Sequence, residues 1–313
     1  MDRFEAMRTL IAAVDGGSLS AASRALNMPL PTVSRRVSDL EAHLGAQLLV
    51  RTSRRLILTE AGEAFVAAAR RLLDDLADAE RAASGEFRSP RGELVVTAPI
   101  MFGKLHVAPI VHAFLAAYPD VTVRLILSDQ VIDLSEAHVD VAVRIGRLPD
   151  SDLIARAVGH VRWVICASPD YLARRGTPAA PEALSGHDCI AFEGLQTHRN
   201  WQIGPARAAR TIAIVPRLSV NTADAVIAAA TAGLGIARIM SYQAASAIAQ
   251  GQVRTILTGF PGDPMPVNLV HPNQRVQPIK RRAFLDFAVP RLKGVLAAVT
   301  AAASGEGIVP AAR

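Results

Sequence analysis

GGSLSAASRALNMPLPTVSRRVSDLEAHLGAQLLVRTSRRLILTEAG, residues 16–62, is the stretch of sequence that decides the fold. It predicts two short helices separated by a tight break at Asn27-Met28-Pro29. Ser18 or Ser20 can cap the first of these helices, and Pro31 stands in the first turn of the second, where proline is tolerated. Two helices joined by so short a break must pack against one another.

The helix that begins near Pro31 has an apolar side and a polar side. Its predicted core positions are Val33, Val37, Leu40 and Leu44, and a glycine follows them. At about 100° per residue, Arg35 lies almost opposite this stripe. Thr32, Ser38 and Asp39 flank Arg35, and Arg36 lies at the border. This layout suits a helix that enters the major groove of DNA, although a solvated surface helix would have the same pattern.

The segments on either side favour the DNA-binding interpretation. Upstream, residues 1–15 predict one more helix, with a buried stripe of Phe4, Met7, Leu10, Ile11 and Val14. Downstream, residues 48–50 and 56–58 predict two short strands around a turn that contains Arg51, Arg54 and Arg55. Three arginines so close together repel one another unless they are solvated or face phosphates. The hairpin is therefore predicted to be a wing that contacts the DNA backbone.

A long helix is predicted after the hairpin, from Thr59 to about Phe87. Apolar residues recur along it at nearly heptad intervals: Ala61, Phe65, Ala68, Leu72, Leu76, Ala79 and Ala83. At about 1.5 Å per residue it extends roughly 40 Å, more than a small domain can cover. A second copy of the chain would cover it and would hold two DNA-reading helices at a fixed separation. Packing against its own chain is the alternative.

Beyond a linker near Ser89-Pro90-Arg91-Gly92, strands and helices alternate. The first series predicts a strand over 93–98, a helix over 104–118, a strand over 121–127, a helix near Val131 and a strand over 139–144. The second series contains extended segments at 161–167, around 190, at 211–215 and at 234–239, with an alanine-rich helix after Asn221. A strand over 267–271 and a terminal helix over 279–298 can return to the first series. Two α/β lobes with a cleft between them are expected.

These motifs resemble those of the LysR-type transcriptional regulators. In the N-terminal part the resemblance rests on Gly17-Ser18-Leu19, Ala21-Ala22, Val33-Ser34-Arg35, Leu40-Glu41, Leu44-Gly45, Arg51 and Leu58-Thr59-Glu60-Ala61-Gly62. It continues through Ala98-Pro99, Phe102-Gly103, Leu127-Ser128-Asp129, Val143-Arg144-Ile145-Gly146, Ala167-Ser168-Pro169-Asp170-Tyr171-Leu172 and Ala232-Gly233-Leu234-Gly235-Ile236-Ala237. About 300 residues are covered.

The resemblance implies an α/β protein with an N-terminal winged helix-turn-helix, a long linker helix and a two-lobed periplasmic-binding-protein-like effector domain. Its expected bounds are 1–58 for the DNA-binding domain, 59–88 for the linker or dimerisation helix, and 89–302 for the effector-binding domain. Lobe one would comprise 91–162 and 266–302, lobe two 163–265, and 303–313 a disordered tail. The implied partners are double-stranded promoter DNA, a small-molecule effector, further copies in a homodimer that assembles to a homotetramer, and RNA polymerase if the protein is an activator.

The residues expected at the DNA are Ser18, Ser20, Leu30, Pro31, Thr32, Ser34, Arg35, Arg36, Arg51, Arg54 and Arg55. One departure from the family pattern concerns specificity. Pro29 and Leu30 stand where relatives commonly have Ser and Gln. Leu30 cannot donate a hydrogen bond to a base edge but can contact a thymine methyl, so the base code of relatives is not carried over.

The effector is expected at the carboxyl ends of strands, where helix N-termini direct backbone N–H groups into the cleft. The expected residues are Pro99, Ile100, Met101, Phe102, Ser128, Asp129, Arg144, Ile145, Gly146, Arg147, Asn221 and Thr222. In the family, the place of Arg147 holds an effector carboxylate in some members, so a small carboxylate is the expected ligand, with a surface role for Arg147 as the alternative. Met101 makes the wall more apolar, and Trp163 either adds to that wall or belongs to the core.

Composition sets outer limits on these expectations. The formal net charge is +6, but nearly all the basic residues are arginine, so the placement of the arginines counts for more than their number. Cys166 and Cys189 lack metal-like spacing, and neither a cofactor nor a metal is expected. No apolar run of about 20 residues was found, which predicts a cytoplasmic protein without membrane contact.

Two other classes of function remain as alternatives. An enzyme would draw on His187, Asp188, Cys189 and on His160 near Cys166, but GxSxG, HExxH and glycine-rich phosphate motifs are absent from the sequence. The chain is therefore not expected to be an enzyme. An architectural DNA protein whose α/β part serves only assembly is the second alternative. Saturable binding of a metabolite that changes promoter occupancy would separate it from a regulator.

Overall fold

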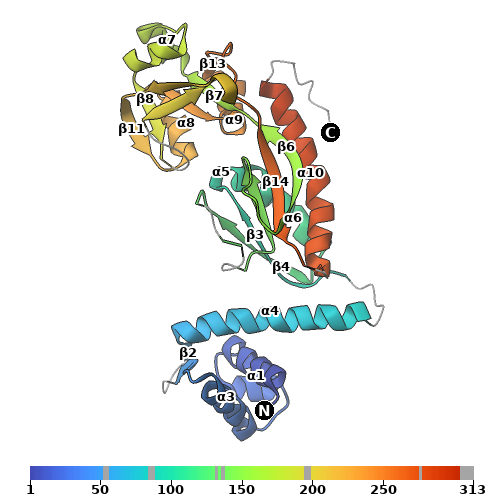
Figure 1. Cartoon of the computed structure of the whole chain (residues 1–313). Helices are drawn as coiled ribbons and strands as arrows, with labels where there is room; N and C mark the ends of the chain where they lie inside the picture. The colour runs from blue at the N-terminus through green and yellow to red at the C-terminus, as the bar shows by residue number, and fades with distance from the viewer. Residues whose placement is uncertain are drawn as a thin grey trace. The chain divides into compact units, whose positions relative to one another are not determined.

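The computed structural model divides the chain into two compact units, Met1–Ser89 and Pro90–Arg313 (Figure 1). It describes residues 1–51, 56–83, 89–130, 133–134, 138–193, 199–274 and 277–303. The helix expected near Val131 falls largely outside these ranges. So does the tail expected over 303–313, apart from its first residue.

The first unit consists of three short helices, a two-stranded hairpin and a long helix. They are α1 (Arg3–Asp15), α2 (Leu19–Ala25), α3 (Leu30–Leu44), β1 (Leu49–Arg51), β2 (Leu56–Leu58) and α4 (Glu60–Ala83). β1 and β2 pair antiparallel. The core contains Leu10 from α1, Val37 and Leu40 from α3, Leu48 before the hairpin and Val66 from α4. All the helices of the unit therefore share one apolar centre, to which α2 adds the half-buried Leu19. α2 also packs through Ala22 on Ala13 and Val33.

Two residues predicted for the core of this unit are exposed. Phe4 is 46% exposed, because α1 buries the closely packed stripe of Ala6, Thr9, Leu10 and Ala13 instead. Phe4 is six residues before Leu10, about 120° away around the helix. Leu44 is 40% exposed, since it is the last residue of α3 and directly precedes the left-handed Gly45.

In the second unit, the first five-stranded sheet has the order β4-β3-β5-β14-β6. Its strands are β3 (Gly92–Ala98), β4 (Val121–Leu127), β5 (Val141–Ile145), β6 (Leu153–Val161) and β14 (Met265–Pro272). β3 is parallel to β4 and β5, whereas β14 is antiparallel to β5 and β6. One face is covered by α5 (Ile100–Phe102), the π-helical turn η1 (Gly103–Val107), α6 (Ala108–Ala117) and α10 (Ile279–Ala303).

The second five-stranded sheet has the order β11-β8-β12-β7-β13. Its strands are β7 (Trp163–Ala167), β8 (Cys189–Phe192), β11 (Pro216–Val220), β12 (Ile236–Met240) and β13 (Arg254–Ile256). One face packs on α8 (Ala223–Thr231) and α9 (Ser241–Ala249). The other face packs on α7 (Pro169–Arg175), the 3-10 turn η2 (Pro181–Gly186) and a hairpin of β9 (Asn200–Ile203) and β10 (Arg210–Ala213), with the short turn η3 (Ala206–Ala208) between these two strands.

The chain passes twice between the two sheets. It leaves the first sheet at the end of β6, crosses at Arg162 and enters β7; it returns between β13 and β14. The segment expected to be extended over 211–215 lies mainly in the β9–β10 hairpin and not in the five-stranded sheet, where β11 takes the edge position. Two sheets that share two crossings form a two-lobed unit.

The run Ile100–Ala117 is long and apolar enough, by length and composition, to span a membrane. This finding qualifies the expectation from sequence that no such run exists. Ile110, Val111 and Phe114 of this run are buried against the first sheet and α10. Core packing therefore explains why the segment is apolar.

Candidate functional site

The polar side of α3 is open, as its sequence predicts. Arg35 is exposed and Leu30 is 43% exposed, whereas Val33 and Val37 are fully buried beneath them. Pro31 is exposed, and Thr32 and Ser34 are half-buried. α3 thus presents a ridge with the exposed Arg35 at its first two turns.

Arg36 differs from Arg35 because it already has a partner. Its Nη1 donates to Glu5 Oε2 of α1 at 2.9 Å, with about a third of the arginine side chain exposed. Glu5 also pairs with Arg8 at 3.4 Å. Arg36 therefore ties α3 to α1, a role that its border position on the helix did not reveal.

α2 is set in front of α3 by its cap and by the break that follows it. Ser18 accepts a hydrogen bond from Ala21 N at 3.1 Å, so Ser18 is the cap, and Ser20 is exposed. Asn27 takes the left-handed conformation, with φ of 48°, which asparagine tolerates well. The Ser23 hydroxyl donates to Met28 O at 2.6 Å and closes the break.

The wing is attached to the helices by two polar residues. Glu41 of α3 accepts backbone hydrogen bonds from Leu48 N at 2.9 Å and Leu49 N at 3.0 Å. Thr59 donates to Gln47 O at 2.7 Å and accepts from Gly62 N at 2.9 Å, which caps α4. These bonds fix the base of the hairpin. Arg51 lies in β1, whereas the wing residues Arg54 and Arg55 lie outside the described residues.

Gly62 is required for the close contact between α4 and the wing. A Cβ atom built there would lie 2.0 Å from Leu48 O, a distance that only a backbone shift can relieve. The motif Leu58-Thr59-Glu60-Ala61-Gly62 thus has a physical reason: it caps α4 and lets the helix approach the strand. The sequence alone marked the motif by resemblance without giving this cause.

α4 has two apolar stripes. Gly62, Val66 and Ala69 are buried against the unit's own core. Phe65, Leu72 and Leu76 lie about 60° further around the helix, and Leu72 is 51% exposed. The first stripe packs within the chain, and Phe65 of the second also contacts this core. Leu72 is left exposed, and pairing with a second copy stays a prediction.

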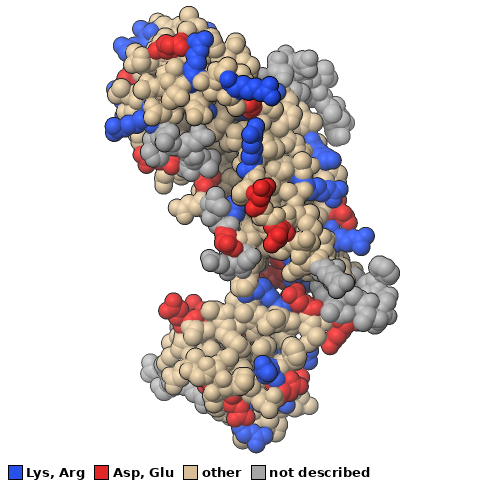
Figure 2. All heavy atoms as spheres, in the orientation of Figure 1, with Lys and Arg blue, Asp and Glu red and all other residues tan. Residues whose placement is uncertain are grey.

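Charge does not gather in one patch on the face of the molecule seen in Figure 2. Lys and Arg alternate there with Asp and Glu over both units. The net charge of +6 belongs to the whole chain, and this face alone shows no basic patch that would indicate nucleic-acid contact.

In the second unit, the expected effector residues lie at one edge of the first sheet and at the start of α8. β3 and β4 are parallel and in register from Gly92↔Val121 to Ala98↔Leu127, so Pro99 and Ser128 leave the sheet side by side. Ile100 N donates to Asp129 Oδ1 at 3.0 Å, which joins these two segments directly. Asn221 is exposed and Thr222 is half-buried at the N-terminus of α8.

A salt bridge connects the lobes at this place. Lys104 Nζ, from the π-helical turn of the first lobe, lies 3.3 Å from Asp224 Oδ2 in the first turn of α8. Both side chains are about half exposed. Neither residue was singled out from sequence, because lysine and aspartate on helix surfaces carry no signal until the two lobes are placed. The segments 99–104, 128–129 and 221–224 therefore lie close together where the two lobes meet.

Of the residues expected at the effector, Phe102, Met101 and Arg147 differ in how far their side chains are buried. Phe102 is fully buried, with edge-on contacts to His106 and Tyr242, so its ring belongs to the core and not to the cleft wall. Met101 is half-buried. Arg147 is exposed and has no hydrogen bond or ion pair within the part of the chain that the structure describes.

The adjoining strand β5 supplies the rest of this edge. Arg144 and Ile145 are half-buried and pair with β14 through Asn268 and Val267. Gly146 N donates to Pro266 O at 2.8 Å and takes a φ of +112°, a conformation that favours glycine. This turn redirects the chain directly before Arg147.

Burial and neighbours change the pKa values of the two cleft carboxyls in opposite directions. Burial raises the pKa of Asp129, against the hydrogen bond from Ile100 N, and the charge of Asp224 adds to the rise. A hydrogen bond from Thr222 lowers the pKa of Asp224, assisted by Lys104. Asp129 already occupies one backbone N–H at the start of α5, that of Ile100.

The residues considered for catalysis do not form a nucleophile and base. Cys189 is buried, its Sγ faces Leu184 O at 3.8 Å, and burial raises its pKa to about 12. His187 instead contacts the hydroxyl of Tyr171 at 3.1 Å. Burial also raises the pKa of Cys166 to about 12. A thiol of such high pKa is a poor nucleophile at neutral pH.

Two family models match the chain. Residues 4–63 match the model described as "Bacterial regulatory helix-turn-helix protein, lysR family", and residues 87–293 match the "LysR substrate binding domain". The chain therefore belongs to the LysR family of transcriptional regulators. It is a DNA-binding regulator with a C-terminal effector-binding domain, and neither model describes a catalytic domain.

Named relatives and solved structures agree with this assignment. An HTH-type transcriptional regulator of Xanthomonas campestris pv. campestris is 36% identical over 89% of this chain and 82% of its own length. CrgA of Neisseria meningitidis, a LysR-type regulator, has a solved structure with a TM-score of 0.60 at 33% identity, covering 92% of this chain and 98% of CrgA. The full-length Vibrio cholerae virulence activator AphB gives 0.59 at 29% identity, covering 92% and 99%.

Proposed function

We propose that the polar ridge of α3 reads base pairs in the major groove of promoter DNA. The observation that carries this proposal is Arg35, an exposed arginine with no ion pair or hydrogen bond of its side chain among the described residues, on a helix whose opposite side is buried. Leu30, Pro31, Thr32 and Ser34 flank it and would contact bases or phosphates.

The remaining predicted DNA contacts would go to phosphates. Ser18 and Ser20 lie at the start of α2, and Arg36 would add a phosphate contact from the part of its guanidinium that Glu5 leaves exposed. Arg51, Arg54 and Arg55 of the wing would contact the backbone beside the groove.

We further propose that α4 pairs two copies of the chain through the stripe of Phe65, Leu72 and Leu76, and that dimers assemble to a homotetramer. The exposure of Leu72 supports a partner helix, since the other stripe of α4 is already buried. A two-fold pair would present two α3 ridges to successive turns of one DNA face. The protein would act in the cytoplasm, and an activating form would contact RNA polymerase.

For the effector we propose a small carboxylate in the cleft between the lobes. Arg147 and Lys104 are the cations that can hold it, because Arg147 has no partner in the described part of the chain and Lys104 has only an exposed one. Exposed salt bridges are worth little, about 0–1 kcal/mol, so an effector can replace Asp224 at Lys104 at small cost. Pro99, Ile100, Met101, Ser128, Asn221 and Thr222 would form the walls, with the turn at 144–147 beside them.

Replacement of Asp224 by the effector carboxylate at Lys104 gives a mechanism by which effector binding changes the protein. Lys104 and Asp224 form one link between the two lobes. When the effector takes Lys104, this link is lost, which would shift the balance between lobe arrangements by about 0–1 kcal/mol. Effector binding and lobe position would then be coupled, as a regulator requires.

The DNA-reading role is tested by selecting fragments of the source genome with the full-length protein at moderate salt. We expect recovery of discrete intergenic fragments. Arg35→Ala should reduce discrimination between these and random DNA by about 1–3 kcal/mol, whereas a double change at Arg54 and Arg55 should mainly flatten the salt dependence. Equal losses on specific and random DNA for Arg35→Ala would refute the base-reading role.

The effector proposal is tested by calorimetry with carboxylates that alter promoter occupancy. Arg147→Ala should weaken such a ligand tenfold or more, as loss of a charge-assisted pair predicts. Arg156→Ala, an exposed arginine on β6, is the matched control. Unchanged affinity in Arg147→Ala would remove this residue from the site.

A further inference from the structure

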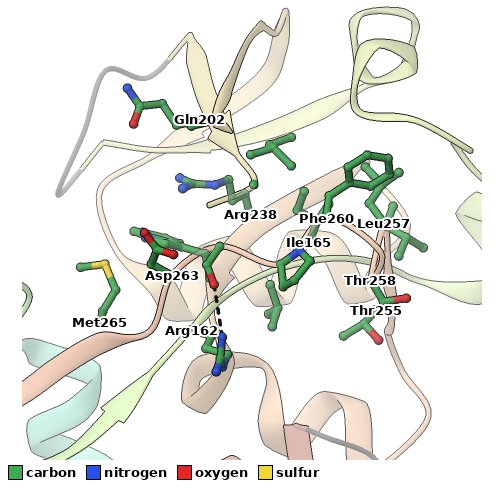
Figure 3. A pocket seen from close by; sticks show the side chains of 18 of the residues that line it. Arg162, Ile165, Gln202, Arg238, Thr255, Leu257, Thr258, Phe260, Asp263 and Met265 are labelled. Carbon is green, nitrogen blue, oxygen red and sulfur yellow. Dashed lines mark hydrogen bonds between the residues drawn. The ribbon is translucent and has the colours of Figure 1, made fainter. Parts of the chain in front are cut away.

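A cavity of about 310 Å³ lies in the second lobe, away from the cleft just described. It is enclosed by β7, β12 and β13 of the second sheet, by the β9–β10 hairpin and by the segment 257–263 (Figure 3). None of the proposed effector residues lines it. Its volume is at the lower end of the range for small-molecule pockets, about 300–1,000 Å³.

Most of the cavity wall is apolar. Trp163, Ile165, Ile203, Ile256, Phe260 and Met265 contribute side chains from five different segments. Such a wall suits the body of a small aromatic or aliphatic molecule. Polar groups form the rest of the wall, and these decide which ligand fits.

The dominant polar group is Arg238 of β12. Its guanidinium projects into the space between Gln202 of the hairpin and Asp263 (Figure 3). Within the described residues Arg238 has no ion pair and no hydrogen bond; its one recorded contact is with the ring of Trp163, at 4.2 Å from guanidinium carbon to ring centroid. Burial lowers the pKa of Arg238 to about 10, so the group is still a cation at neutral pH.

Among the described residues around the cavity, no carboxylate forms an ion pair with Arg238. Asp263 is the acidic residue of the wall, and its Oδ2 already accepts from Ala206 N at 3.0 Å. The side chain of Arg162, the second cation, donates to a neutral partner, Gly262 O, at 3.3 Å. Two guanidinium groups and one engaged carboxylate give the cavity a net positive charge.

A purely structural role does not explain this arrangement well. A largely buried cation without a counter-charge costs free energy, and a cation–π contact returns only part of that cost. An aliphatic residue at position 238 would pack against Trp163 and Ile165 without the penalty. An anion paired with the guanidinium would offset the free-energy cost of burying this positive charge.

We propose that this cavity is a second ligand site, for a small monocarboxylate with an apolar body, whose carboxylate pairs with Arg238 and whose body packs between the hairpin and the second sheet. The site is distinct from the cleft between the lobes and does not depend on it.

The position of the cavity also connects it to the movement of the lobes. Arg162 and Asp263 of its wall belong to the two chain crossings between the sheets. The backbone of Arg162 is fixed to α9, because Ser241 N donates to Arg162 O at 2.7 Å. A ligand beside both crossings would change the relative stability of lobe arrangements.

The test uses full-length protein and 4-fluorobenzoate as the probe, with binding followed by fluorine NMR of the ligand. We expect saturable binding below about 10 mM, and at least tenfold weaker binding of the neutral analogue 4-fluorobenzyl alcohol. Arg238→Met, which keeps an unbranched apolar stem and removes the charged guanidinium, should weaken the probe tenfold or more. Arg207→Met, an exposed arginine of the same hairpin, should leave affinity within twofold.

A second variant guards against a misfolded Arg238→Met protein. Ala209 is exposed at the cavity wall, so Ala209→Phe should close the cavity without a change in the core, and it too should weaken the probe tenfold. Absence of binding by the wild-type protein overturns the proposal, as does binding that both variants leave unchanged. Binding lost in Arg147→Ala but retained in Arg238→Met would place the probe in the cleft, which overturns this site and supports the other one.

Discussion

Removal of the Glu41 side chain should detach the wing from α3. Its Oε1 accepts from Leu48 N at 2.9 Å and from Leu49 N at 3.0 Å, and Glu41→Ala leaves both N–H groups without that acceptor. Hydrogen bonds to a charged group contribute about 1.5–3 kcal/mol each. Glu41 is half-buried, so water replaces part of the loss, and we expect the base of the wing to be destabilised by about 2–3 kcal/mol.

The assay is hydrogen exchange of the full-length protein, read on peptides that cover residues 44–51. A loss of about 2–3 kcal/mol corresponds to exchange roughly 30- to 150-fold faster for amides that exchange by local opening. Glu41→Gln, which retains an accepting oxygen, should lie between Glu41→Ala and the wild type. Glu63→Ala removes an exposed glutamate of α4 and serves as the control.

The same variant should lower DNA affinity on specific and random fragments alike, because the wing contacts phosphates in our proposal. If Glu41→Ala exchanges no faster than Glu63→Ala over residues 44–51, Glu41 does not anchor the wing and the reasoning is wrong.

Three further outcomes are expected. Gly62→Ala should lower the thermal unfolding temperature of the protein by several degrees, since its Cβ would lie 2.0 Å from Leu48 O. Gly294→Ala, where nothing lies within 4 Å, is the control and should not lower it. Equal effects of the two variants would contradict the close approach of Gly62 to Leu48. Leu72→Glu should dissociate the oligomer in sedimentation experiments, whereas Ala67→Glu, about 140° away on the same helix, should not. An unchanged sedimentation coefficient of Leu72→Glu would remove α4 from the dimer interface. Cys166 and Cys189, with pKa values raised to about 12, are protonated at pH 8, so iodoacetamide should label neither in the folded protein and both in urea; rapid labelling without denaturant would refute their burial.

Periodicity located the helices and the hairpin of the first unit well, because each is a local pattern. Val33, Val37 and Leu40 lie in the core as their spacing predicted. Phe4 and Leu44 do not, since hydrophobicity alone does not distinguish the middle of a helix from its ends. Ala6 and Ala13 permit close contact between helices, and both are fully buried in the core of this unit. Their low hydrophobicity makes them hard to predict as core residues, and larger residues such as Phe4 were predicted there instead.

The effector-binding part was predicted less completely because its key contacts are between segments far apart in the chain. Lys104 and Asp224 are 120 residues apart and meet only once both lobes are folded. The cavity around Arg238 is also built from segments far apart in the chain. Part of its wall is the β9–β10 hairpin, whereas the sequence predicted an extended segment of the second lobe there. Phe102 was expected at the ligand because it follows a strand end, yet its side chain turns into the core, a direction that the strand end does not determine.

The most direct test of the account is a hydroxyl-radical footprint of the full-length protein on a genomic fragment that it selects. The account predicts protected segments on one face of the duplex, related by two-fold symmetry and separated by multiples of about 10.5 base pairs, which fade in Arg35→Ala. A single asymmetric footprint, or protection that is the same on random DNA, would contradict it.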